Sequence, residues 1–276
     1  MAQYSTVLAD EFNTIRNTVA TVLGTGSTTR GYGSPITSSE VAVGQKIKPD
    51  EYTALKTDIN ACYNHIAGTN ATLNSVVKGG KITWANIVTY QVAATYIDAN
   101  RDSSIAVNST VSKTITFSKG WGTGGLTQNR SESGSVVWAS ADAMRHFFNQ
   151  GGYLYIYGSA SGGTSPDKTK TFVELTRSIG FTLTKNEYRA GTGAGQNLTT
   201  AVAPYSGGTP SSLTANFIRY DSTAINWVFT ANDTGSEDGD ADGIVANSTI
   251  DVDLTFYVIA YSATGTGITD YKPAIY

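Results

Sequence analysis

Hydrophobic residues recur at every third or fourth position in the N-terminal third of the chain. This spacing is typical of amphipathic helices that bury one face, and it occurs in three segments: residues 6–23, 48–65 and 84–101. Gly24 and Gly68 follow the first two segments and favour helix ends there. Cys62 lies on the apolar stripe of the second segment, which predicts a core position. Val88 and Val92 belong to the third stripe, so we expect three helices to bury their stripes together.

The first two helical segments resemble each other. Asp10-Glu11-Phe12 and Asp50-Glu51-Tyr52 occupy equivalent positions 40 residues apart, and the apolar residues that follow keep the same spacing. This similarity indicates a duplicated helix-loop unit. Residues 25–37 are rich in Gly, Ser and Thr and predict a loop or small ribbon between the helices. We therefore assign residues 1–102 to a helical N-terminal region.

After Asp102 the hydrophobic period changes from about 3.6 to two, which predicts strands. In residues 249–258 every second side chain is apolar, and these should face a core: Ile250, Val252, Leu254, Phe256 and Val258. Six further strands are expected, at 111–117, 135–138, 153–157, 181–184, 212–220 and 225–230. Short helices are expected at 140–149 and 170–178. The fold class is thus α+β, mainly β, with an antiparallel β-sandwich over residues 103–276.

Composition narrows the possible functions. Of 276 residues, 15% are charged and the net charge is −3, with no basic block that would bind a phosphate backbone, so no nucleic acid partner is expected. The start of the chain lacks a signal-peptide pattern and no long apolar run occurs, so we expect folding in a cytosol without membrane insertion. The chain has a single cysteine, which excludes internal disulfides and cysteine-based zinc cages. It has only two histidines, which disfavours an enzyme.

Two groups of motifs carry a resemblance to a known family. The N-terminal group comprises Asp10-Glu11-Phe12-Asn13-x-x-Arg16, Gly24-Thr25-Gly26 and Gly31-Tyr32-Gly33. The C-terminal group is Met144-Arg145-x-Phe147-Phe148-Asn149-x-Gly151-Gly152, followed by the aromatic strand Tyr153-Leu154-Tyr155-Ile156-Tyr157. Together they resemble fibre-type virion structural proteins of tailed bacteriophages, especially those that infect marine cyanobacteria.

This resemblance implies a virion component that is synthesised in the host cytoplasm. It would be a component of the fibre, neck, tail or capsid surface, and its expected partners are copies of itself and other virion proteins. The helical region would assemble and the β domain would be displayed, with no catalytic residues. The alternative is a receptor- or glycan-binding module of a phage adhesion device. Long, weakly charged strand edges also favour symmetric multimers, because uncovered edges are a liability.

An acidic segment near the C-terminus fits the first half of a calcium loop. Asp238, Asp240 and Asp242 alternate before Gly243, and the carbonyl of Ile244 suits the next ligand position. Position twelve is Thr249 instead of a bidentate glutamate. The favoured interpretation is therefore a solvated acidic hairpin tip, with a weak Ca²⁺ site as the alternative. No other cofactor is expected.

Candidate catalytic groups are few. Asp142 and His146 are spaced to form a pair on one helix face, and Ser131, Ser133 or Ser140 would have to supply a nucleophile. None of these serines lies in a G-x-S-x-G elbow, so we assign no catalysis and expect a surface pair on a capped helix. His65 is expected to complement the C-terminal dipole of the second helix.

The remaining candidates are glycine-rich loops and aromatic residues. Residues 120–125 and 191–195 are glycine-rich, but neither opens a helix in the way a phosphate-binding loop does, so flexible connections are expected. Trp121, Trp138, Trp227 and the 16 tyrosines could stack on sugars. Core or subunit-interface positions are the favoured interpretation for these aromatic residues.

Overall fold

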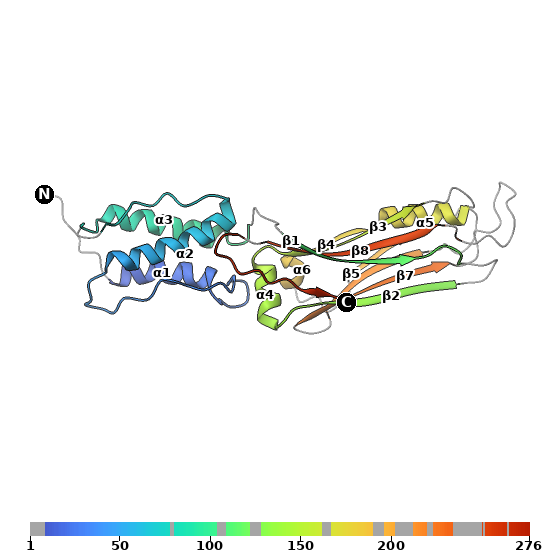
Figure 1. Cartoon of the computed structure of the whole chain (residues 1–276), viewed down its shortest axis with the longest axis horizontal. Coiled ribbons are helices and arrows are strands. Elements are labelled where there is room, and N and C mark those ends of the chain that lie inside the picture. Colours follow the sequence, from blue (N-terminus) through green and yellow to red (C-terminus); the bar gives the residue numbers. More distant parts are fainter. Residues whose placement is uncertain are drawn as a thin grey trace. The chain divides into compact units, whose positions relative to one another are not determined.

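A computed structural model shows mixed helices and antiparallel sheets, which confirms the α+β class. The structure is 37% helical and 30% strand, so the expectation of a mainly β chain was wrong. It describes residues 9–77, 80–103, 109–121, 128–161, 167–189, 196–201, 212–219, 223–233, 250, 252–263 and 265–276. The contacts divide the chain into two compact units (Figure 1). Unit 1 comprises residues 1–109, 141–152 and 262–272, and unit 2 comprises residues 110–140, 153–261 and 273–276.

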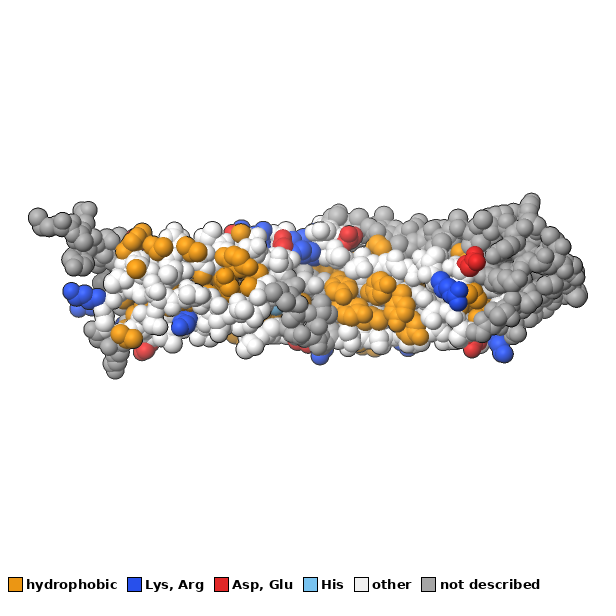
Figure 2. All heavy atoms as spheres, turned by 90° about the horizontal axis from the view of Figure 1, so that it is seen from above, with side chains coloured by type: hydrophobic (Ala, Val, Ile, Leu, Met, Phe, Trp, Pro, Cys, Tyr) orange, Lys and Arg blue, Asp and Glu red, His pale blue; other side chains and the backbone are white. Residues whose placement is uncertain are grey.

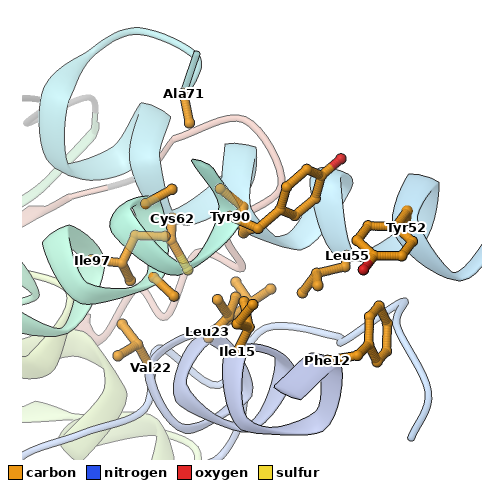
Figure 3. Close-up of a cluster of buried hydrophobic side chains, with 14 of the residues drawn as sticks. Phe12, Ile15, Val22, Leu23, Tyr52, Leu55, Cys62, Ala71, Tyr90 and Ile97 are labelled. Carbon is orange, nitrogen blue, oxygen red and sulfur yellow. The ribbon is translucent and has the colours of Figure 1, made fainter. Parts of the chain in front are cut away.

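Unit 1 is built on the three expected helices: α1 (Ala9–Leu23), α2 (Pro49–Ala67) and α3 (Trp84–Asn100). They contact one another pairwise around a shared apolar core (Figure 3). Tyr52 of α2 makes edge-on ring contacts with Phe12 of α1 at 5.2 Å and Tyr90 of α3 at 5.3 Å. Cys62 is fully buried, as predicted. Among the described residues, no helix is both long and apolar enough to cross a membrane.

The predicted stripe of α3 is only partly correct. Ile87 and Ile97 are buried in the core, but the side chains of Val88 and Val92 are 37% and 63% exposed. The spacing alone could not separate the two sets, because α3 is apolar around most of its circumference and two faces have a similar hydrophobic appearance. Only packing against α1 and α2 decides which face is covered.

The loop between α1 and α2 is held by a buried carboxylate. Asp58 of α2 accepts hydrogen bonds from the amide and hydroxyl of Thr37, at 2.9 and 2.7 Å, and from those of Ser38, at 2.9 and 2.6 Å. A buried carboxylate is tolerated when donors of this kind satisfy its oxygens. Asp58 therefore fixes the course of the loop against α2.

Unit 1 also contains two segments from the C-terminal half of the chain. One includes α4 (Ala141–Asn149), and the other spans residues 262–272. The chain consequently passes five times from one unit to the other, whereas the sequence pattern suggested a single division after residue 102. Periodicity assigns a residue to a helix or a strand, but it does not say which core the element joins.

Unit 2 contains two sheets. The four-stranded sheet has the order β1-β8-β3-β4, and the five-stranded sheet has the order β5-β6-β7-β2-β9. The strands are β1 (Ser109–Phe117), β2 (Gln128–Val137), β3 (Tyr153–Ser161), β4 (Gly180–Leu183), β5 (Gln196–Ala201), β6 (Ser212–Arg219), β7 (Ala224–Asp233), β8 (Asp253–Ser262) and β9 (Ala274–Ile275). Helices α5 (Asp167–Ser178) and α6 (Lys185–Arg189) lie on either side of β4 in the chain. Of these elements, β5, β9 and α6 were not predicted from the sequence.

Alternating burial along the strands of unit 2 agrees with the sequence pattern. The five apolar side chains assigned to the inner face, from Ile250 to Val258, are all buried. The regular strand begins at Asp253, because Ile250 makes only an isolated bridge to Trp121. Phe229 of the five-stranded sheet stacks against Phe256 of the four-stranded sheet, with ring centroids 4.6 Å apart. Aromatic side chains of both sheets therefore share one core.

Candidate functional site

The predicted calcium ligands Asp238, Asp240, Asp242 and Ile244 all lie outside the described residues. The same holds for Thr249 and for the glycine-rich loop 191–195. Within the described part of the chain, no group of three His, Cys, Asp or Glu side chains could hold a metal ion. The calcium site therefore stays a prediction from the sequence.

Asp142 and His146 of α4 do not form the predicted surface pair. Asp142 is exposed and accepts a hydrogen bond from Arg145 at 2.9 Å, which holds the pKa of the Asp142 carboxyl below its usual value. His146 is buried, and its Nε2 lies 3.1 Å from the carbonyl oxygen of Thr25. The same Nε2 lies 3.0 Å from the guanidinium of Arg145, so His146 contacts both Arg145 and the Thr25 carbonyl. Both residues lie on a helix, as predicted, but Asp142 contacts Arg145 and His146 contacts Thr25 instead of each other.

The three serines considered as nucleophiles lie on β2 and directly before α4. Ser131 lies on β2, where its hydroxyl donates to the carbonyl of Phe229 at 3.1 Å. Ser133 is exposed on the same strand, and Ser140 directly precedes α4. An activated serine needs a base within hydrogen-bond distance.

Instead, α4 carries a cluster of side chains that bind backbone carbonyls, which we call the α4 cluster: Arg145, His146, Asn149 and Gln150. Arg145 donates to the carbonyls of Arg30 and Thr25, both at 2.9 Å. The Nδ2 of Asn149 donates to the carbonyl of Arg30 at 3.1 Å. The α4 cluster thus satisfies carbonyl groups of the loop after α1, which forms no regular secondary structure that would pair them.

Gln150 joins three parts of unit 1. The side-chain Nε2 of Gln150 donates to the carbonyl of Tyr32 at 2.7 Å and to that of Thr269 at 2.8 Å. The main-chain carbonyl of Gln150 accepts a hydrogen bond from Nε2 of His65 at 2.8 Å. Gln150 and His65 are both buried. Gln150 therefore connects the α1–α2 loop, the end of α2 and the C-terminal segment.

The pKa values of the two histidines of unit 1 are both lowered. Burial lowers the pKa of His65, and its hydrogen bond to Gln150 offsets this only in part. Burial also lowers the pKa of His146, and the neighbouring Arg145 guanidinium adds to this effect. His65 was expected to complement the C-terminal dipole of the second helix; it lies in the last turn of α2, where its Nε2 contacts the main-chain carbonyl of Gln150.

Gly33 is required where the α1–α2 loop meets α4. Its backbone has a φ of +69°, and a Cβ at this position would lie 2.2 Å from Nδ1 of His146 and 2.4 Å from the hydroxyl of Tyr271. That hydroxyl donates to the Gly33 carbonyl at 2.6 Å. The Gly31-Tyr32-Gly33 motif and the Met144–Gly152 motif, more than 100 residues apart in the sequence, therefore meet in one network.

Unit 2 presents a different candidate surface, which we call the tyrosine face: Tyr153, Tyr155 and Tyr157 of β3 with Tyr257 and Tyr261 of β8. All five are half-buried on the outward side of the four-stranded sheet. Tyr153 stacks on Tyr261 at 4.7 Å, and Tyr157 stacks on Tyr257 at 4.5 Å. Partial burial and neighbouring tyrosines raise the pKa of Tyr153 and Tyr157, so their hydroxyls stay protonated at neutral pH.

The tryptophans proposed for sugar stacking are part of the core. Trp121, Trp138 and Trp227 are all less than 5% exposed. Trp227 contacts Phe229 with ring centroids 5.6 Å apart. This confirms the favoured interpretation for the three tryptophans. The tyrosine face, by contrast, depends on the pairing of β3 with β8, which places Tyr153 beside Tyr261 and Tyr157 beside Tyr257. Neither strand alone predicts this arrangement.

Comparisons with known proteins add no assignment to this geometry, because no family model, curated protein or solved structure matches the chain. The α4 cluster and the tyrosine face must therefore be interpreted from their own chemistry. In the α4 cluster the described donors are directed at carbonyls of the chain itself, which is the chemistry of a structural joint.

Proposed function

We propose that the chain is a structural protein of a tailed-bacteriophage virion, assembled through its helical unit and displaying its β unit. Fibre, neck, tail and capsid surface are all compatible positions for it in the particle. The observation that supports this proposal most is that the two motif groups of the phage resemblance contact each other. Arg145 and Asn149 of one group bind carbonyls next to or within the Gly31-Tyr32-Gly33 motif of the other, and Gln150, at an unspecified position of the first motif, binds the Tyr32 carbonyl.

This contact explains why a structural protein would contain both motifs. A glycine at position 33 leaves room for α4, and the polar side chains of α4 satisfy the loop that the glycines shape. Each motif is needed by the other, as expected for a protein whose role is to keep its shape within a particle.

We further propose that the two sheets of unit 2 form a β-sandwich. The alternating burial of β7 and β8 and the stacking of Phe229 on Phe256 support it, because a sandwich buries the inner faces of two sheets against each other. Such a unit exposes its outer faces and loops for display.

The test is the composition of purified phage particles. Particles from lysates of the source should contain peptides of this chain after density-gradient purification, and an antibody against the purified chain should label one fixed position in electron micrographs. A label scattered over debris, or a chain that remains in the soluble fraction, would contradict the virion proposal.

The tyrosine face supports a second candidate, a glycan- or receptor-binding module. Aromatic rings bind sugars through their faces, and in this cluster Tyr157 already stacks with two neighbours, Tyr257 at 4.5 Å and Tyr155 at 5.5 Å. Tyr261, by contrast, has a ring contact only with Tyr153 among the described residues. Replacing Tyr261→Ala should then abolish binding of the purified chain to host polysaccharide, while the outward control Thr255→Ala retains it. No binding by the wild-type chain would exclude this candidate.

A further inference from the structure

The outward face of α3 differs from those of the two helices that pack against it. The exposed residues of α1 are Asp10, Thr14 and Asn17, and those of α2 are Asp50, Thr53 and Thr57. All six are polar. The exposed residues of α3 are Trp84, Ala85, Val88, Gln91, Val92, Thr95 and Ala99, none of which is charged.

Among the described residues, three of the large hydrophobic side chains that are exposed to solvent belong to α3. Trp84 is 51% exposed, Val88 37% and Val92 63%. On the face seen in Figure 2, hydrophobic side chains lie along the helical unit with few charged groups among them. A helix that is apolar on both its inner and its outer face is usually buried on both.

The spacing of the exposed residues indicates what covers them. Ala85, Val88, Val92, Thr95 and Ala99 alternate by three and four positions, the spacing of a left-handed coiled-coil seam. Small and β-branched side chains along such a seam allow a second helix to approach closely. The partner expected for this face is therefore another helix.

The charge of the face restricts the partner further. The only charged residue of α3 is Asp98, and it is already bound to Arg30 at 3.1 Å and Arg101 at 3.5 Å. A charged helix seated on this seam would lose the hydration of its charges without gaining an opposite charge. The partner must be as neutral as the seam, and α3 of a second copy meets this requirement, since an isologous interface pairs a patch with itself.

We propose that the α3 face, defined as Trp84, Ala85, Val88, Val92, Thr95 and Ala99, is the self-association surface of this protein, where α3 helices of separate copies pack as a coiled coil. This inference rests on the proposed function, in which the chain assembles through its helical unit, and it names the surface through which the copies associate. It concerns contact between copies of the chain, whereas the virion proposal concerns where those copies reside.

The first test is the mass of the full-length chain in solution. Light scattering after gel filtration should give a multiple of the 29.1 kDa chain for the wild type and 29.1 kDa for Val92→Asp. The matched control is Asn17→Asp, which places the same carboxylate at an exposed position of α1 and should keep the wild-type mass. Circular dichroism should show equal helix content in all three proteins, because both sites are exposed in the single chain.

The second test does not depend on introducing a charge. In Val92→Cys the new thiol is exposed, whereas the native Cys62 is fully buried, so a short bis-maleimide should join two copies only through position 92. Asn17→Cys should give no covalent dimer under the same conditions.

A monomeric wild type, or a Val92→Asp variant that keeps its mass, would overturn the inference. A chain that self-associates as expected but is absent from purified particles would overturn the virion proposal and leave the α3 interface standing. A chain found in particles but monomeric in solution would do the reverse.

Discussion

The two units of this protein satisfy their backbone hydrogen-bonding groups in different ways. In unit 1, buried polar side chains such as Asp58, Asn149 and Gln150 reach backbone groups of the α1–α2 loop. In unit 2, neighbouring strands satisfy the backbone, and alternation places apolar side chains inside. Unit 1 therefore depends on a few specific contacts, whereas the stability of unit 2 is distributed over many similar positions. Both histidines of the chain belong to unit 1.

The largest effect is expected in the core of unit 1, from Leu55→Asp. Leu55 is fully buried between the helices. Burying an uncompensated polar group costs about 2–7 kcal/mol, and an unpaired carboxylate costs more because it is charged. The helical unit should fail to fold, as measured by chemical denaturation, and particle incorporation should be lost. Thr53→Asp, on the exposed side of the same helix, should fold and assemble normally. Equal behaviour of the two variants would contradict the shared core.

In unit 2 a comparable truncation is Phe256→Ala. Phe256 is fully buried and contacts Phe117 and Phe229, so its removal should lower the free energy of unfolding by about 3–5 kcal/mol. Its neighbour Tyr257 points to the outward face, and Tyr257→Ala should cost clearly less. A similar loss for both would show that the tyrosine face is as essential to stability as the core.

The joint between the α1–α2 loop and α4 can be tested with two glycines. Gly33→Ala combines an unfavourable positive φ with a Cβ placed 2.2 Å from His146, whereas Gly44→Ala has a φ of +84° and no atom within 4 Å. Backbone strain alone costs about 1–2 kcal/mol, so Gly33→Ala should be more destabilising than Gly44→Ala. Hydrogen exchange should become faster in α4 for the first variant only. Equal exchange rates would mean that α4 does not depend on this contact.

Lowering the pH should weaken unit 1 before unit 2. The pKa values of His65 and His146 are lowered in the folded state, so the unfolded chain binds more protons as the pH falls below about 6.5. Their contribution to stability is complete above this pH and declines toward the lower folded pKa values. Between pH 7.5 and 5.5, the protection of backbone amides relative to their intrinsic exchange rates should fall in α4 but not in β8. The double variant His65→Gln, His146→Gln should lose this pH dependence.

The smallest effect concerns the acidic segment outside the described residues. If Asp238, Asp240 and Asp242 bind calcium weakly, a calcium concentration equal to the dissociation constant would stabilise the chain by about 0.4 kcal/mol. Calorimetry at millimolar calcium should then detect binding, and the double variant Asp240→Asn, Asp242→Asn should abolish it. Absence of heat in the wild type would support the solvated hairpin tip.

Local structure followed from the sequence wherever one residue pattern sufficed. The helices α1, α2 and α3, the short helix α4 and the inner face from Ile250 to Val258 were all anticipated, because periods of 3.6 and two depend only on neighbouring residues. The short elements β5, β9 and α6 were missed, since few residues carry each pattern. The core position of Cys62 followed from the same stripe.

Contacts between distant segments were decided by the tertiary structure alone. Nothing in the sequence pairs Asn149 with the carbonyls of residues 30 and 31, because a backbone carbonyl is present at every position and has no signature of its own. For the same reason, the sequence could not assign α4 and residues 262–272 to unit 1. It also could not separate Ile87 from Val88 on an almost uniformly apolar helix. Periodicity is a local property, whereas the choice of partner depends on which surfaces fit together in space.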